Sequence, residues 1–426
     1  MDTIFALATA QGKAGVSIIR ISGQAAHDLV KLFAEPLPKA RVATLRNLKH
    51  EHEIIDQAFV IRFDKPFSYT GENMIELQCH GSIAVIAKLF KLLTEKYGFR
   101  LAEPGEFTRR ALENGRLDLM QIEGLADLID AETEIQRRQA QRSLSGVLGK
   151  YVEDWRTKLI RSIALIEATL DFSDEEVPVN VTPEVDKLIC CVVKDISCHL
   201  SNAKVSERIR NGFEVAIIGP PNVGKSTLVN FLAGRDAVIT SEFAGTTRDV
   251  IEVKMDLNGL PVTILDTAGL RESNEVIENI GIERAKERAD LADLRIFLSD
   301  TMNPSVPLKS SDIWVKPKAD QRQKKADAIS GITGEGISEL LNQITKILST
   351  RTQSTGLITR ERHFNAIKIA FDVLTKSLVS LSEGPEQYEF VAEDLRLAIR
   401  SLESLIGRID TEDFLNDIFS SFCLGK

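Results

Sequence analysis

The sequence predicts a multidomain protein that combines α/β and all-α parts. We expect an N-terminal α+β domain at 1–117, a helical domain in two pieces at 118–212 and 351–426, and an inserted P-loop (Ras-like) nucleotide domain at 213–350. At 426 residues the chain is too long for one compact core, which predicts two or three domains. A phosphate-binding motif stands mid-chain, and apolar residues at helical spacing flank it on both sides. The two junctions of such an insertion are expected to lie close together.

Composition is that of an ordinary globular protein, with 43% hydrophobic and 27% charged residues. No apolar run reaches the length of a membrane span, and no signal-peptide pattern opens the chain. The net charge of −9 argues against broad, nonspecific coating of nucleic acid. The five cysteines lack disulfide or metal-ligand spacing, so a reducing cytoplasm is expected. A local basic patch is one candidate feature, although such charges on a helix are usually a solvated face: Arg137, Arg138, Arg142 and Lys150.

The N-terminal region is expected to be a mixed α/β module. Alternating and β-branched residues predict strands at 16–21, 57–63 and 74–79, and helices are expected at 25–32 and 83–93. Loops that combine glycine with charge often hold small-molecule sites. Three such clusters occur, at 69–72, 76–81 and 104–110. A structural role is favoured over a catalytic one for His80, which stands in the second cluster.

The pattern turns helical after residue 117. One long amphipathic stretch is expected from 117 past 148, and a second passes through Trp155, Leu159, Ile163 and Ile166. Thr182 is expected to cap a further helix, with Pro183 at its first position. Three cysteines fall on that helix and are expected to fill its core: Cys190, Cys191 and Cys198.

Helical spacing returns after the nucleotide domain. Two sets of apolar residues lie three and four positions apart and predict two more helices: Phe364, Ile367, Phe371, Leu374 and Leu378, then Val391, Leu395, Ala398, Leu402 and Leu405. Asn211 and Gly212 end the first helical part.

The phosphate-binding motif reads GPPNVGKST at 219–227. It follows an apolar run at 215–218 and opens into a predicted helix at 226–233, which is the required strand–loop–helix context. Two glycines let successive N–H groups point at phosphate oxygens, and the helix N-terminus adds partial positive charge. Lys225 would neutralise the β- and γ-phosphates, and the Ser226 hydroxyl would bind Mg²⁺. A glycine-rich turn that binds nothing is the disfavoured alternative.

Two further phosphate motifs follow in the expected order. Asp266, after an apolar strand at 262–265, would hold Mg²⁺ through water, and Gly269 would contact the γ-phosphate. Between these motifs lies the sequence GTTRD at 245–249, where Thr247 would give Mg²⁺ a second hydroxyl. Leu270 occupies the position at which Ras-like GTPases carry the glutamine that orients water. The nearest carboxylates are Glu275 and Glu278, for each of which the sequence alone favours a solvated glutamate.

Guanine is the favoured base. Lys318, Ala319 and Asp320 follow a predicted strand at 313–316 and resemble the end of the N-K-x-D motif, in which the carboxylate accepts from guanine N1–H and its amino group. Pro317 replaces the usual asparagine. Ser330 begins a Ser-Gly-Ile sequence where Ser-Ala-Lys is usual. Because of these two departures, the base pocket is expected to be weakened. The segment 300–312 is also shorter than the helix that is normally found there.

Taken together, these residues resemble the MnmE (TrmE) family of tRNA-modifying GTPases. The match spans nearly the whole chain, at 2–4, 12–15, 20–23, 69–72, 76–81, 104–110, 114–121, 170–172, 281–285 and the terminal FCLGK at 422–426. The resemblance implies a cytoplasmic homodimer joined through its N-terminal domains, each binding 5,10-methylene- or 5-formyl-tetrahydrofolate. It also implies a K⁺-activated GTP hydrolase that, in a heterotetramer with the FAD-dependent MnmG, adds an aminomethyl-type group to C5 of uridine 34 of certain tRNAs.

The resemblance also implies site residues. Folate would contact Arg20, Glu76, Arg116 and Lys426, with arginine at 116 where the family often has lysine. K⁺ would be held by the side chains of Asn222 and Thr246 and by the carbonyls of Ser241 and Phe243. Glu278 matches the catalytic glutamate, beside Lys225 and Asp266, but one extra residue makes Glu275 a rival. The nucleotide-binding set is Asn222, Val223, Gly224, Lys225, Ser226, Thr227, Ser241, Glu242, Phe243, Ala244, Gly245, Thr246, Thr247, Asp266, Thr267, Ala268, Gly269, Lys318, Asp320 and Ser330.

Two alternatives stay open. A stand-alone regulatory or ribosome-assembly GTPase would explain the phosphate motifs but not the terminal sequence or the N-terminal module. A degenerate, weakly hydrolysing nucleotide domain would explain Pro317 and the short segment at 300–312. Cys423 is either a nucleophile or a packing residue, and packing is favoured because no base is identifiable. Phe414, Ile418 and Phe419 are expected to dock the final helix, with 422–426 extending from its end.

Overall fold

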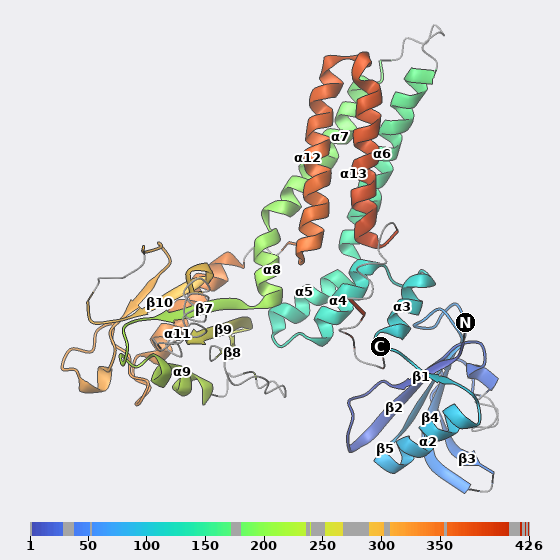
Figure 1. The fold of residues 1–426 in the computed structure, drawn as a ribbon, viewed down its shortest axis with the longest axis horizontal. Helices are drawn as coiled ribbons and strands as arrows, with labels where there is room; N and C mark the ends of the chain where they lie inside the picture. Colours follow the sequence, from blue (N-terminus) through green and yellow to red (C-terminus); the bar gives the residue numbers. More distant parts are fainter. Residues whose placement is uncertain are drawn as a thin grey trace, which may run out of the picture. The chain divides into compact units, whose positions relative to one another are not determined.

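The computed structural model describes residues 2–28, 38–51, 53–171, 180–235, 239, 252–266, 289–301, 307–352, 356–408, 418, 419, 422 and 425. The chain folds as two compact units, Met1–Ala126 with Leu402–Lys426, and Asp127–Ser401. The expected fold class is confirmed: an N-terminal α+β part, a set of long helices and a P-loop α/β sheet are all present (Figure 1). Among the helices described, none is both long and apolar enough to span a membrane.

Six strands form the N-terminal sheet within the described residues, in the order β3-β4-β5-β2-β1-β6. Its elements are β1 (Ile4–Leu7), β2 (Ala14–Ser22), β3 (Thr44–His50), β4 (Glu53–Phe63), β5 (Met74–Gly81), α2 (Ile83–Glu95), β6 (Arg100–Leu101) and α3 (Glu106–Glu113). The three predicted strands and the helix at 83–93 are confirmed. Of the helix expected at 25–32, residues 26–28 are helical and 29–32 lie outside the described residues.

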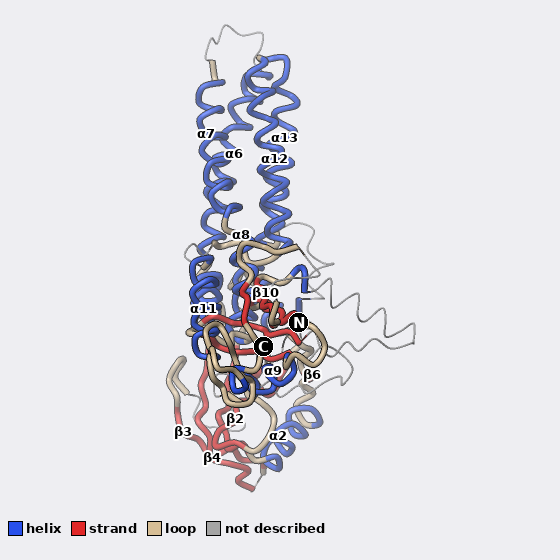
Figure 2. The backbone as a smooth tube through the Cα atoms, turned by 90° about the vertical axis from the view of Figure 1, so that its left-hand side faces the viewer, coloured by secondary structure: helices blue, strands red, loops and turns tan. Residues whose placement is uncertain are grey.

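One face of this sheet carries α2, which lies to one side of β2, β3 and β4 in Figure 2. Leu89 and Leu93 of α2 are fully buried against inward residues of the strands, such as Ile19, Val60 and Leu77. Alternation along each strand sends the next residues to the opposite face. Those residues include Arg20 and Glu76, which pair in register on β2 and β5.

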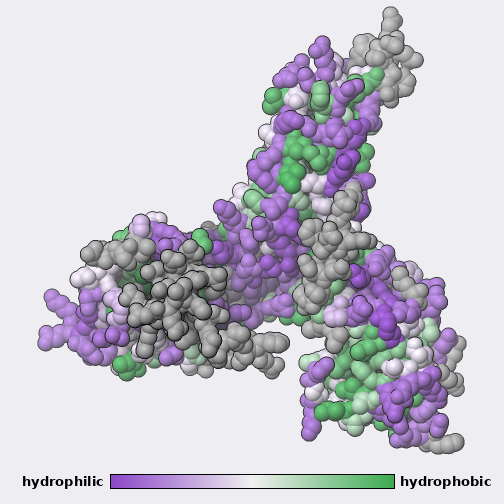
Figure 3. Space-filling view, viewed as in Figure 1, coloured by the Kyte–Doolittle hydropathy of each residue, from purple (hydrophilic) through white to green (hydrophobic). Residues whose placement is uncertain are grey.

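The helical region contains α4 (Leu119–Ile129), α5 (Glu134–Leu144), α6 (Val147–Asp171), α7 (Thr182–Ser201), α8 (Ala203–Asn211), α12 (Glu361–Glu383) and α13 (Tyr388–Ile406), with a 3₁₀ turn at Pro385–Gln387. Another 3₁₀ turn, at Ala319–Gln321, follows β11 in the nucleotide domain. Helices α6, α7, α12 and α13 run side by side in Figures 1 and 2. Their outward surface is mainly hydrophilic, with a few hydrophobic side chains between (Figure 3). The predicted periodicity is confirmed for the second apolar set, in which every residue from Val391 to Leu405 is buried. In the first set only Ile367 and Leu374 are buried, and the other three residues are half-buried.

The amphipathic stretch from 117 past 148 is helical, and it is divided into α4, α5 and the start of α6, because Gln136 caps a new helix and Gly146 adopts a left-handed φ of 71°. Two other expectations for this helical region are wrong. Thr182 is the first helical residue rather than the cap, and its hydroxyl lies 2.6 Å from the Tyr388 hydroxyl. The three cysteines of α7 are exposed, because Val185, Ile189, Val192 and Ile196 form its buried stripe: Cys190, Cys191 and Cys198.

The nucleotide-domain sheet has the order β11-β10-β7-β9-β8 in the described residues. Its elements are β7 (Phe213–Ile218), α9 (Lys225–Ala233), β8 (Glu252–Leu257), β9 (Leu260–Asp266), β10 (Leu294–Leu298), β11 (Ile313–Val315) and α11 (Ile337–Arg351). All pairs are parallel except the β8–β9 hairpin, whose turn is Asn258-Gly259. Both turn residues have positive φ, at 54° and 88°, which is the requirement of a tight hairpin turn.

Arg295 on β10 organises the short segment before β11. Its guanidinium donates to Asp312 at 2.7 and 3.0 Å and to the carbonyl of Pro307 at 2.7 Å. The side chains of Arg295 and Asp312 are 2% and 5% exposed, so the pair is nearly dry. This buried ion pair ties the described part of the short segment, 307–312, to β10.

Candidate functional site

The phosphate-binding loop lies between β7 and α9. Asn222 and Gly224 both adopt left-handed backbone angles, with φ of 59° and 111°. At Gly219 a Cβ would lie only 2.3 Å from the carbonyl oxygen of Leu298, so no other residue fits there. These constraints turn the chain sharply onto the N-terminus of α9, where backbone N–H groups and the helix dipole favour an anion.

Lys225 begins α9 and is 6% exposed. Its ammonium donates to the carbonyls of Gly219 at 2.7 Å and Pro220 at 2.9 Å. Burial lowers the pKa of Lys225, and the nearby charge of Asp266 acts in the opposite direction. A bound anion would stabilise the charged form of this buried ammonium. This agrees with the expectation that Lys225 neutralises the charge of bound phosphates.

Asp266 ends β9 directly beside β7, in register with Ile217, and is 1% exposed. Ser226 is half-buried on the first turn of α9. A carboxylate and a hydroxyl at neighbouring strand and helix ends are the oxygen donors that Mg²⁺ prefers. These residues therefore fit a magnesium ion bound together with a nucleotide.

The base-side residues lie next to the phosphate loop. Ser330 is 1% exposed, and its hydroxyl accepts from the N–H groups of Ile332 and Thr333. A Cβ at Gly331 would lie 2.8 Å from backbone atoms of Thr227 and Leu228, which explains glycine where alanine is usual. The two base-side loops are joined by a hydrogen bond of 3.1 Å from the N–H of Ala319 to the Ile329 carbonyl.

Lys318 and Asp320 project from this base-side turn and are exposed. Lys318 has a φ of 57°. Pro317 is buried, and its carbonyl accepts from Arg322 Nε at 2.6 Å. A backbone contact of this kind does not replace the side-chain amide of the usual asparagine.

Several predicted nucleotide-site residues lie outside the described residues. These are Ser241, Glu242, Phe243, Ala244, Gly245, Thr246, Thr247, Thr267, Ala268, Gly269, Glu275 and Glu278. Val223 packs against the core of the sheet, and Thr227 is exposed on α9.

A second candidate site lies in the N-terminal unit around Arg20. Its guanidinium donates to Glu76 Oε1 from Nε at 3.0 Å and from Nη2 at 2.9 Å. Nη1 donates to the carbonyl of Gly425 at 3.2 Å. The cation also faces the rings of Tyr69 and Phe107, at 5.1 and 5.8 Å from the ring centres. Arg20 and Glu76 were both predicted site residues, and the fold brings them together.

Arg116 is exposed and lies beside the loop that carries Tyr69. Its Cγ would be 3.2 Å from a Cβ on Gly71, which has a φ of 78°. The loop at 69–72 therefore contacts Arg20 at one end and Arg116 at the other. Lys426 and Cys423 lie outside the described residues.

Phe422 packs against an apolar cluster near the C-terminus. Phe422 is 8% exposed and packs with Phe419 and Ile122, in a cluster to which Ile418 adds. The N–H of Phe422 donates to the Phe419 carbonyl at 3.0 Å, and this turn brings Phe422 back to the cluster. The expected docking by Ile418 and Phe419 is confirmed, whereas the expected extension of Phe422 is wrong. Phe414 lies outside the described residues.

Sequence reasoning noted the cluster at 104–110 but missed what it does. Arg110 is 5% exposed and pairs with Asp2, Glu72 and Glu106 at 2.9 to 3.1 Å. Glu72 in turn accepts from the Ser22 hydroxyl at 2.7 Å. This network fixes the loop at 69–72 next to Arg20. Its signal in the sequence was the charge beside glycine in the clusters at 69–72 and 104–110, which supply Glu72 and Arg110.

Comparison with known proteins places the chain in a family. A sequence model of the MnmE helical domain matches residues 119–423, and a model of the GTP-binding protein TrmE N-terminus matches residues 3–116. The tRNA modification GTPase MnmE of Ruegeria pomeroyi is 56% identical over 428 residues, covering 100% of both chains. That of Roseobacter denitrificans is 57% identical over 429 residues, again covering 100% of both. The chain belongs to the MnmE family of tRNA modification GTPases.

As a member of the MnmE family, the chain is a GTP hydrolase. A solved structure of Aquifex aeolicus Era bound to GDP and AlF₄⁻ is 26% identical and covers 38% of this chain and 66% of that chain, with a TM-score of 0.26. With so low a TM-score, this structure supports no conclusion about the present chain. The MnmE relatives, in contrast, align with it from end to end.

Proposed function

We propose that this MnmE-family chain is a K⁺-activated, Mg²⁺-dependent GTPase that adds an aminomethyl-type group to C5 of uridine 34 of certain tRNAs. It would act as a homodimer with an FAD-dependent MnmG partner and a tetrahydrofolate donor, in the cytoplasm. The observation that carries the proposal is the Arg20 site, where a cation, a carboxylate and the C-terminal segment meet. A stand-alone regulatory GTPase would explain the phosphate motifs but not this site.

The residues around Arg20 fit a folate. A folate combines a polar pterin ring with an anionic glutamate tail. Glu76 can accept hydrogen bonds from the pterin amino and ring N–H groups. Arg116 is exposed, so its guanidinium can bind a carboxylate of the glutamate tail. Tyr69, with its pKa raised by burial, supplies a flat wall beside Arg20. When bound, the folate supplies the one-carbon unit, and these residues hold and orient it.

The C-terminal segment would close this site. A Cβ at Gly425 would lie 2.3 Å from the Leu7 carbonyl oxygen, so the backbone there runs directly against β1. We propose that Lys426, which lies outside the described residues, also contacts the folate. Cys423, three positions before the end, would then position the segment or pack against it.

The homodimer is proposed to form on the open face of the N-terminal sheet. Large apolar side chains stand on that face with much of their surface exposed: 56% for Val16, 48% for Leu45 and 47% for Phe59. Leu45, Phe59 and Gln78 lie opposite one another on β3, β4 and β5, so these three residues form one row across the sheet. The row lies next to the pair of Arg20 and Glu76. A second copy of the chain would cover this row, as the family resemblance implies.

In the nucleotide domain, Lys225 would hold the phosphates, Ser226 and Asp266 would hold Mg²⁺, and Asn222 would contribute to the K⁺ site. Hydrolysis would use Glu278, with Glu275 as its rival. Ser330 and Asp320 would bind guanine. K⁺ bound at this site would supply positive charge that stabilises the negative charge developing during hydrolysis, in place of a glutamine after Gly269.

Mass spectrometry of wobble uridines tests the proposal. Cells that lack the chain should lose the aminomethyl-type modification, and restoring the wild-type chain should return it. Restoration with an Arg20→Ala chain should fail although the purified variant still hydrolyses GTP. Full modification without Arg20 would favour the stand-alone GTPase, and hydrolysis too slow to measure in the wild type would favour a degenerate nucleotide domain.

A further inference from the structure

The two connections to the nucleotide domain meet at one carboxylate. Arg210, near the end of α8, leads into β7, and Arg360 precedes α12 on the return. Arg360 Nη2 lies 2.6 Å from Asp127 Oδ1, and Arg210 Nη1 lies 3.8 Å from the same oxygen. Arg210 Nε also donates to the carbonyl of Thr359 at 3.2 Å. Asp127, which is 13% exposed, therefore ties both connections to the end of α4.

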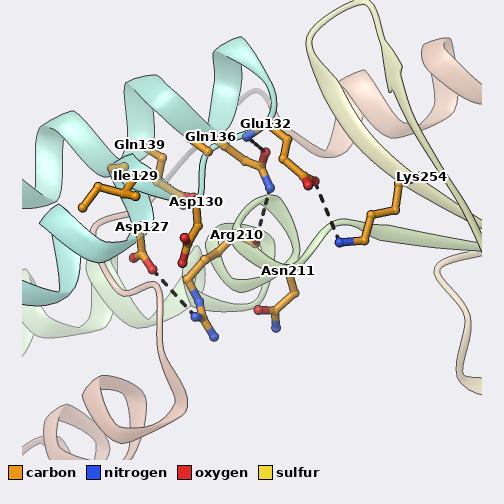
Figure 4. Close-up of a pocket in the computed structure, with 11 residues that line it drawn as sticks. Asp127, Ile129, Asp130, Glu132, Gln136, Gln139, Arg210, Asn211 and Lys254 are labelled. Carbon is orange, nitrogen blue, oxygen red and sulfur yellow. Dashed lines mark hydrogen bonds and ion pairs between the residues drawn. The ribbon is translucent and has the colours of Figure 1, made fainter. Parts of the chain in front are cut away.

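Gln136 makes a second tie at the N-terminus of α5. Its Oε1 accepts from the N–H groups of Glu132 and Thr133, both at 3.1 Å, which caps the helix. Its Nε2 donates to the carbonyl of Arg210 at 3.0 Å. One side chain thus binds the start of α5 to the end of α8 (Figure 4).

The β8–β9 hairpin touches the same place. Its turn residue Gly259 accepts from the N–H of Ile135 at 3.4 Å, and Lys254 of β8 pairs with Glu132 at 3.9 Å. Figure 4 shows Lys254 and Glu132 pointing toward one another. Both residues line a polar cleft of about 610 Å³. The other end of β9 is Asp266, the candidate magnesium ligand, one strand length away.

We propose that Asp127 and Gln136 are positioning residues that couple the nucleotide site to α5. A displacement of Asp266 on exchange of GDP for GTP would be carried along the stiff two-stranded hairpin to Gly259, and from there to the N-terminus of α5. Asp127 and Gln136 tie α5 to both connections. The movement of the hairpin would therefore shift α5 and the two connections together. This proposal needs only GTP binding and does not depend on the folate or K⁺ assignments.

Hydrogen–deuterium exchange on the full chain tests the proposal, with GDP and with guanylyl imidodiphosphate. In the wild type, exchange of the amides at 134–138 should differ between the two nucleotides by about fivefold or more. Asp127→Ala should reduce the difference to less than about twofold, with the kcat for GTP hydrolysis within about threefold of wild type. A Lys376→Ala variant, which removes an exposed pair with Asp394 on the bundle, should behave as wild type.

Gln136→Glu is the sharper variant. Glutamate keeps the two cap hydrogen bonds, so α5 should fold, but it loses the donor to the Arg210 carbonyl. It should abolish the nucleotide dependence as Asp127→Ala does, and it decides the question if Asp127→Ala fails to fold. The proposal is overturned if wild-type α5 exchanges alike with both nucleotides, or if folded Gln136→Glu keeps the full difference.

Discussion

The guanidinium of Arg20 donates a 3.2 Å hydrogen bond to the carbonyl of Gly425, a residue 405 positions later in the chain. The same guanidinium holds Glu76 with two further bonds. A chain terminus is normally frayed and dispensable. Here the backbone at Gly425 forms one wall of the proposed folate site. Changes at the last residues should therefore alter folate binding by the N-terminal domain.

Removing residues 423–426 should weaken folate binding and abolish tRNA modification. A lost hydrogen bond to a charged group is worth about 1.5–3 kcal/mol, so the Kd for a stable folate analogue should rise by roughly 10- to 100-fold. Calorimetry measures this directly. GTP hydrolysis by the truncated chain should stay near normal, and full-strength folate binding would show that the C-terminal segment belongs to another site.

Asp320→Asn should change the preferred base. If the carboxylate accepts from guanine N1–H and its amino group, an amide there creates a mismatch of about 1–3 kcal/mol and should favour xanthosine triphosphate over GTP. Competition binding with the two nucleotides measures the change. Pro317→Asn is the companion variant and should tighten GTP, since it restores the usual side chain. Unchanged relative affinities in Asp320→Asn would remove that residue from the site.

Hydrolysis by the wild type should be slow in Na⁺ and faster in K⁺. The side chain of Asn222 is tested best by glycine, because Asn222 has a φ of 59° and alanine would add backbone strain. Asn222→Gly should make the rates in the two salts equal while Mg²⁺–GDP binding is retained. Equal rates in both salts for the wild type would refute the potassium assignment.

Glu278→Ala should lower kcat with little change in nucleotide affinity, because a residue that positions water acts in the transition state. Single-turnover hydrolysis with radiolabelled GTP measures the chemical step. Glu275→Ala serves as the matched control and should be near wild type. The reverse result would move the catalytic role three residues earlier.

Arg295→Ala should destabilise the nucleotide domain. It leaves the Asp312 carboxylate buried without its main partner, which typically costs about 3–5 kcal/mol. Urea unfolding followed by tryptophan fluorescence reports this through Trp314. Lys368→Ala, which breaks an exposed pair with Asp372, should change stability by less than about 1 kcal/mol.

The same ion pair predicts a pH dependence. Burial alone would raise the pKa of Asp312, but hydrogen bonds from Arg295 and from the Lys309 N–H hold it below its ordinary value. The pair's contribution is therefore present at neutral pH and is lost as pH falls through the folded-state pKa of Asp312. The stability gap between wild type and Arg295→Ala should narrow on acidification below about pH 4, and a gap that stays constant there would contradict this account.

The local parts of this protein were determined by the sequence alone. The phosphate loop, the strand before it and the helix after it follow from a short motif whose glycines and lysine act within nine residues. The buried positions of α13 follow from spacing of three and four. The Asn258-Gly259 hairpin could also have been found, because two residues that tolerate positive φ stand between apolar strands.

Only the tertiary structure decided which side of each element is buried and which distant residues meet. Cys190, Cys191 and Cys198 lie on an apolar helix, but the neighbouring helices cover the stripe from Val185 to Ile196 instead. Phe422 turns back because Ile122 and Phe419 offer it an apolar surface, and Asp127 meets Arg360 across 233 positions of chain. Local propensity carries no information about such contacts, because their free energy comes from surfaces that exist only once the whole chain has folded.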